Sequence, residues 1–249
     1  MCEMSGALVW GQPDCLEEQP PESSRGNRAR GTGWQRRVEL RGPAGRLEAL
    51  VNEGAPHAPA AVLLCHPHPL GGGTLHNKVV YRAMKALNAP EFELELTVLR
   101  FNFRGAGLSE GQHDGAAETE DVWAALDWLE SEYGLPIVAA GFSFGAATVL
   151  RACCERPRET VRALVALGLP TEAAGRGYSY AFLKSCTIPK LFLSGERDAF
   201  APAAELARVT AGAAEPKRVV LVPGADHFFT GQLRAMQRTL AGWVKEKAP

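Results

Sequence analysis

The segment from Pro136 to Ala147 constrains the fold of this chain more than any other stretch. The apolar run 136–140 is typical of a strand buried on both faces, and the run beginning at Ser143 has a helical pattern. Almost no chain remains between them, so the turn must be very tight. Gly141 and Gly145 lack the Cβ atoms that would collide there, and Ser143 is predicted to stand at the tip in a strained conformation. Gly-x-Ser-x-Gly at a strand-to-helix junction predicts a nucleophile elbow, with helix N–H groups directed toward an anion formed there.

Strands and helices alternate along the rest of the chain. Two segments of alternating polarity flank Gly42-Pro43-Ala44-Gly45 and predict an antiparallel pair. The remaining elements are expected as strands at 60–65, 94–103, 136–140, 161–167, 191–194 and 219–222, and as helices at 77–87, 118–132, from 143 onward and at 232–246. This order predicts an α/β fold with a doubly wound, mostly parallel sheet of about eight strands flanked by helices.

Length and composition favour one folded domain with an N-terminal extension. The chain has 249 residues, of which 46% are hydrophobic, so it can bury a large core. Residues 11–33 are rich in Pro, Glu, Arg, Ser and Gly, a composition that buries too little apolar surface to offset the entropy of ordering. We therefore expect a disordered leader at 1–33 and an α/β domain at 34–249.

Charge and cysteine content indicate which partners and which cellular location to expect. A net charge of -1 without a basic cluster argues against a nucleic-acid partner. No stretch is long and apolar enough to span a membrane, and the first residues lack the basic start of a signal peptide. The six cysteines are too irregularly spaced for a disulfide scaffold, which predicts reduced thiols and a cytoplasmic location.

Four short segments resemble a known family when taken together: His66-Pro67-His68-Pro69 with Gly72-Gly73, then 77–80, 100–105 and 141–145. With them the chain from Trp34 onward resembles the α/β-hydrolases, and more closely a compact bacterial subgroup without a lid that carries a His-Pro-His-Pro loop and is similar to dienelactone hydrolases and carboxylesterases. The resemblance implies a fold and a chemistry more than it implies a substrate.

A serine nucleophile needs a base, and the base needs an orienting acid. In the fold that the chain resembles, these follow in the order Ser, acid, His. His227 is the only histidine after Ser143 and follows the last predicted strand, so it is the expected base. Asp198 is the expected acid because the resemblance and its loop position after a strand both favour it; Glu196 lies nearer the strand end and is the alternative, whereas Asp226 adjoins the histidine too closely.

An oxyanion hole needs two backbone N–H donors. The residue after the nucleophile, Phe144, is expected to supply one. The loop after the third strand should supply the other, and its Pro67 and Pro69 have no N–H to offer. His68 or Leu70 remains, and the resemblance favours His68.

Two further patterns resemble ligand sites. His66 and His68 have a spacing that occurs in metal sites, but the only potential ligand beside them is Cys65, which belongs to a strand. The segment 104–109 lacks the glycine spacing of a nucleotide loop, and its Arg104 is expected to tie loops together. The sequence therefore predicts neither a metal nor a cofactor.

The connection from Thr171 to Pro189 is too short for an independent lid domain. An open cleft that favours short acyl chains follows from this. Its expected lining consists of Leu70, Phe142, Tyr178, Phe200 and Phe228, with Tyr180 also at the rim.

Together these features predict a serine hydrolase of carboxylic esters that acts through an acyl-enzyme on a small-molecule ester, as a monomer or homodimer without nucleic-acid or membrane partners. Thioester, lactone or peptide hydrolysis by the same residues is the alternative chemistry. A non-catalytic binding protein on the same scaffold is the alternative of another class, and the presence of Ser143, Asp198 and His227 argues against it.

Overall fold

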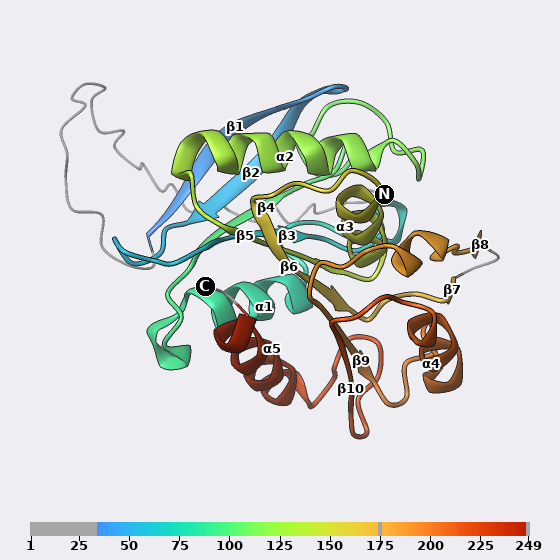
Figure 1. The fold of residues 1–249 in the computed structure, drawn as a ribbon. Helices are drawn as coiled ribbons and strands as arrows, with labels where there is room; N and C mark the ends of the chain where they lie inside the picture. The colour runs from blue at the N-terminus through green and yellow to red at the C-terminus, as the bar shows by residue number, and fades with distance from the viewer. Residues whose placement is uncertain (1–33, 174–175, 248–249) are drawn as a thin grey trace, which may run out of the picture.

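The computed structural model describes residues 34–173 and 176–247 and is built on one large sheet (Figure 1). The expected leader at 1–33 lies outside the described residues. The sheet has eight strands in the order β1-β2-β4-β3-β5-β6-β9-β10, with β2 antiparallel to its neighbours β1 and β4 and all other pairs parallel. These strands are β1 Gln35–Gly42, β2 Gly45–Asn52, β3 Ala61–Cys65, β4 Thr97–Phe101, β5 Ile137–Phe142, β6 Val161–Leu167, β9 Lys190–Gly195 and β10 Lys217–Val222. The predicted doubly wound, mostly parallel α/β sheet is confirmed.

Helices cover both faces of this sheet. They are α1 Lys78–Asn88, α2 Glu118–Tyr133, α3 Phe144–Glu155, α4 Ala203–Ala211 and α5 Leu233–Lys247, with short 3₁₀ turns η1 Pro69–Gly71, η2 Pro90–Phe92 and η3 Ala181–Lys184. α1 and α5 pack into the core on one face, and α2, α3 and α4 pack into the core on the other (Figure 1). The carboxyl ends of the parallel strands therefore meet at one edge, between the two helical layers.

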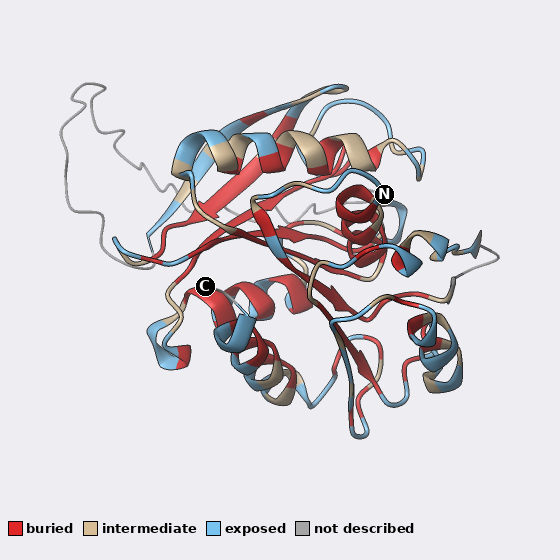
Figure 2. Ribbon diagram, viewed as in Figure 1, coloured by how far each residue is buried: buried red, intermediate tan, exposed pale blue. Residues whose placement is uncertain are grey.

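The central strands are apolar throughout because both of their faces are covered. Every residue of β3, β4 and β5 is buried, as Figure 2 shows in red. Alternate side chains enter opposite layers: Leu63 packs with α2 and α3, whereas Val62 and Leu64 pack with α1 and α5. Continuous apolar runs, rather than alternating ones, are the sequence pattern of such strands.

Two expectations about the elements need correction. The strand predicted at 94–103 extends only over β4, and its amino end starts later than predicted because Glu95 has a φ angle of 44° that interrupts an extended backbone. A small hairpin, β7 Glu172–Ala173 with β8 Arg176–Gly177, was not predicted. Apart from residues 174–175, which are not described, this hairpin and η3 are the only regular structure between β6 and β9, and the fold has no lid domain.

No helix in the described ranges has the length and apolar character needed to cross a bilayer. The cysteines in those ranges, Cys65, Cys153, Cys154 and Cys186, are buried free thiols.

Candidate active site

Ser143 stands at the junction of β5 and α3 in a strained backbone conformation. Its φ and ψ are 55° and -121°, and α3 begins at the next residue. The glycines on either side permit the turn: a Cβ on Gly141 would lie 2.3 Å from the backbone of Gly145, and a Cβ on Gly145 would lie 2.4 Å from the carbonyl oxygen of His66. The close approach explains the Gly-x-Ser-x-Gly spacing physically.

A continuous line of hydrogen bonds joins Ser143, His227 and Asp198. Nε2 of His227 lies 3.0 Å from the Ser143 Oγ, and Nδ1 lies 2.8 Å and 3.0 Å from the two oxygens of Asp198. The Asp198 side chain is fully buried, and that of His227 is 7% exposed. The three residues follow β5, β9 and β10, so the shared carboxyl edge of the sheet brings them together.

The Asp198 carboxylate is held by donors besides the histidine. The N–H groups of Phe200 and Ala201 donate to Oδ1 at 2.8 Å and 3.1 Å, and the Ser194 hydroxyl donates to Oδ2 at 2.9 Å. These hydrogen bonds fix the orientation of the carboxylate. Our reading of the sequence missed Ser194, although its place at the end of the strand that precedes Asp198 could have suggested it.

The two alternative acids, Glu196 and Asp226, form hydrogen bonds with backbone groups. Glu196 is exposed, and its carboxylate accepts the N–H of Gly224 at 2.8 Å. Asp226 accepts the N–H groups of Phe228 and Thr230 in its own turn. Of the three candidates, only Asp198 hydrogen-bonds to His227.

The loop after β3 is fixed around His68. The Leu70 N–H donates to the His68 Nδ1 at 3.2 Å, and the His68 carbonyl accepts the N–H groups of Gly71 and Gly73, each at 3.0 Å. Across from this loop, Phe144 is the first residue of α3, where a backbone N–H has no acceptor within the helix. The Leu70 N–H is thus engaged within the loop.

The His66 side chain has a structural role, because its ring contacts two backbone groups. Its Nε2 accepts the Phe103 N–H at 3.0 Å, and its Nδ1 lies 2.6 Å from the carbonyl oxygen of Pro67. Burial lowers the pKa of His66 to about 4, so the ring is neutral at pH 7. The Phe103 N–H and the Pro67 carbonyl thus contact the two ring nitrogens of His66. In the described part of the chain, no three His, Cys, Asp or Glu side chains gather closely enough to hold a metal ion.

A cleft of about 450 Å³ opens over Ser143 and His227. Leu70 and Phe228 are 75% and 50% exposed beside it. Its lining consists of Pro67, His68, Leu70, Gly71, Gly73, Asn77, Ser143, Tyr178, Phe200, His227 and Phe228.

The expectation that Phe142 lines this cleft is wrong. Phe142 is fully buried, because it follows Val138 and Ala140 on the face of β5 that packs toward α1 and α5. Its ring centroid lies 4.9 Å from that of His227, so Phe142 supports the imidazole from within the core. Tyr180 lies outside the cleft lining as well, and its hydroxyl donates to the carbonyl of Pro170.

Residues 59–248 match the family model described as an alpha/beta hydrolase domain. The chain belongs to the α/β-hydrolase family. A protein from Rickettsia prowazekii is 35% identical over 201 residues, which cover 77% of this chain and 81% of that protein. The structure of an alpha-beta serine hydrolase homologue from Coxiella burnetii is similar, with a TM-score of 0.74, 32% identity, and 84% of this chain and 97% of that chain covered. An α/β serine hydrolase without lid from Xanthomonas campestris has a TM-score of 0.72 and 28% identity, with 85% and 94% covered. Within this family, the described residues between β6 and β9 form no lid domain.

Proposed function

We propose that this hydrolase cleaves carboxylic esters through an acyl-enzyme formed on Ser143. The observation that carries the proposal is the unbroken line of hydrogen bonds from the strained Ser143 through His227 to the buried Asp198. In this geometry Ser143 can act as the nucleophile, His227 as the base and Asp198 as the orienting acid.

The Ser143 Oγ attacks the ester carbonyl carbon while His227 Nε2 takes the hydroxyl proton. The tetrahedral intermediate collapses when the imidazolium returns that proton to the leaving alcohol, which leaves an acyl group on Ser143. Water then repeats the two steps and releases the acid. Asp198 keeps Nδ1 protonated and stabilises the imidazolium, while its bonds to Ser194, Phe200 and Ala201 keep it from turning away.

We assign the N–H groups of Phe144 and His68 as the donors that bind the negatively charged carbonyl oxygen of the tetrahedral intermediate. The first lies at the positive end of α3, and the second belongs to the loop that His66 and the η1 turn hold in place. Loss of one such donor typically costs about 100- to 1000-fold in kcat. No cofactor is required for any step.

The cleft supports short, accessible esters as substrates. Leu70, Tyr178, Phe200 and Phe228 supply apolar contact for a small acyl or alcohol group. Because the connection between β6 and β9 carries no lid domain, a long acyl chain would extend into water rather than into an enclosed tunnel.

The test compares wild type with Ser143→Ala on p-nitrophenyl acetate and butyrate, with labelling by a fluorophosphonate probe as a second readout. We expect turnover and labelling to disappear while the thermal unfolding temperature stays close to that of wild type, because the hydroxyl is not packed in the core. A variant that kept a large share of wild-type turnover would refute the assignment. Thioester, lactone and peptide substrates assayed beside the esters identify the preferred acyl compound.

A further inference from the structure

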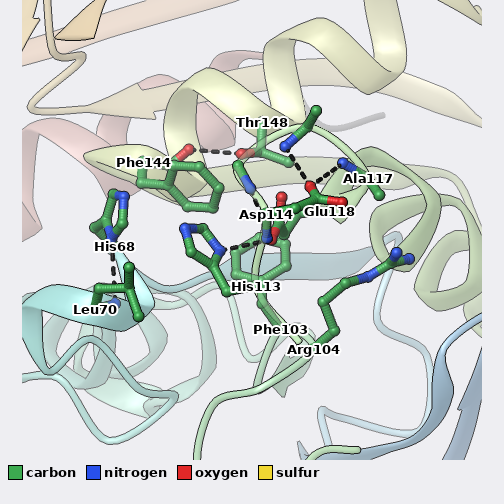
Figure 3. A network of polar contacts seen from close by, with 12 residues as sticks. His68, Leu70, Phe103, Arg104, His113, Asp114, Ala117, Glu118, Phe144 and Thr148 are labelled. Atoms are coloured by element: carbon green, nitrogen blue, oxygen red, sulfur yellow. Dashed lines mark hydrogen bonds and ion pairs between the residues drawn. The ribbon is translucent and has the colours of Figure 1, made fainter. Parts of the chain in front are cut away.

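His113 lies beside the active site but has no part in the reaction proposed above. Its side chain is 3% exposed. Its ring centroid lies 4.6 Å from that of His68 and 5.3 Å from that of Phe144, edge to face in both cases (Figure 3). His68 follows β3 and Phe144 follows β5, so one ring contacts both residues whose N–H groups are assigned to the oxyanion hole.

Glu118 holds the other side of this ring. The Glu118 Oε1 lies 2.5 Å from the His113 Nδ1, and the Glu118 side chain is 1% exposed. The same oxygen accepts the N–H groups of Asp114 and Gly115 at 3.1 Å and 3.3 Å. Glu118 also begins α2, where the helix dipole favours a negative charge. These contacts hold the imidazole beside the Glu118 Oε1 (Figure 3).

The amino end of α2 is itself tied to the end of β4. The Arg104 guanidinium donates to both oxygens of Asp121, at 2.7 Å and 3.0 Å for Oδ1, and the Arg104 N–H donates to Oδ2 at 3.0 Å. Arg104 was expected to tie loops together; it instead ties the segment after β4 to helix α2. Just before it, the Phe103 ring packs 5.5 Å from Phe144. Through Glu118 and α2, His113 is therefore linked to the segment that follows β4.

We propose that His113, held by Glu118, is a positioning residue of the oxyanion hole; this inference rests on the proposed function. The two donors belong to separate elements, the loop after β3 and the amino end of α3, and a displacement of about 1 Å in an active site can cost 100-fold in rate. The ring of His113 packs against both side chains and holds these two elements at a fixed separation. It does not line the cleft, so it acts through His68 and Phe144 and not on the substrate.

A matched pair of double variants isolates the ring from its contact with Glu118. His113→Phe/Glu118→Gln and His113→Ala/Glu118→Gln both remove the contact between the imidazole and the carboxylate and keep an oxygen at 118 for the Asp114 and Gly115 N–H groups. They differ only in the ring. We expect the alanine pair to lose about 10- to 100-fold in kcat, with KM changed less than about threefold, and the phenylalanine pair to stay within about fivefold of wild type.

Two measurements separate positioning from a general loss of structure. Rates are divided by the active fraction from fluorophosphonate titration. The affinity for a phenylboronic acid, which forms a tetrahedral adduct on the Ser143 Oγ, should fall with kcat. Leu240→Ala, which opens a cavity in α5 on the opposite face of the sheet, is the control: it should lower the unfolding temperature and leave kcat unchanged.

His113→Gln tests the same inference in a single variant. The glutamine amide keeps a donor for Glu118, and we therefore expect this variant to fold like wild type. It should lose kcat as the alanine pair does. Equal kcat values in the phenylalanine and alanine pairs, or wild-type kcat in His113→Gln, would overturn the inference. The proposed function fails separately, through an active Ser143→Ala variant.

Discussion

Acid should destabilise this protein partly through one buried histidine, His66. The ring is fully buried, and its Nε2 lone pair accepts the Phe103 N–H, so the fold favours the neutral form. Its pKa is lowered from 6.5 to about 4. The unfolded chain therefore takes up a proton before the folded one, and stability that is complete above pH 6.5 is lost as the pH falls toward 4. At about 1.4 kcal/mol per pKa unit, the loss is about 2 kcal/mol at pH 5 and about 3 kcal/mol near pH 4.

Urea unfolding at pH 7, 6 and 5 measures this contribution. His66→Gln should be less stable than wild type at pH 7, because it disturbs the bonds to Phe103 and Pro67. Between pH 7 and pH 5, however, it should lose about 2 kcal/mol less than wild type does. His76→Gln, at an exposed position, is the matched control and should follow wild type. Equal losses in wild type and His66→Gln over this interval would refute the reasoning.

Other predictions concern catalysis. His227→Ala should lower kcat for p-nitrophenyl butyrate by at least about 1000-fold, since it removes the base; a smaller loss would point to another base. His68→Ala keeps the backbone donor but removes the ring that His113 contacts, so its loss should not exceed the roughly 10- to 100-fold expected of the His113→Ala pair. A loss as large as that of His227→Ala, or inactivation by EDTA, would instead give the His68 side chain a direct role. Ser194→Ala should lower kcat by about tenfold through a looser Asp198, measured as kcat with KM unchanged. Across p-nitrophenyl esters of rising length, activity should peak between acetyl and butyryl, and a preference for palmitoyl would contradict the open cleft.

The sequence by itself determined the features that depend on short stretches of chain. Hydrophobic periodicity distinguishes strands from helices, and the alternation of the two produces a parallel sheet whose carboxyl ends share one edge. The elbow at Ser143 follows from glycines two residues away on either side. The positions of Asp198 and His227 after later strands follow from the order of the chain. These inferences needed no contact between distant residues.

Contacts between residues that are distant in sequence were decided only by the tertiary structure. Phe142 looked exposed beside the nucleophile, but the pleat of β5 directs it into the core below His227. His113 and His68 are far apart in sequence, and neither local pattern shows that their rings meet. Periodicity records whether a residue is covered, whereas the partner that covers it depends on how strands and loops from distant parts of the chain pack together.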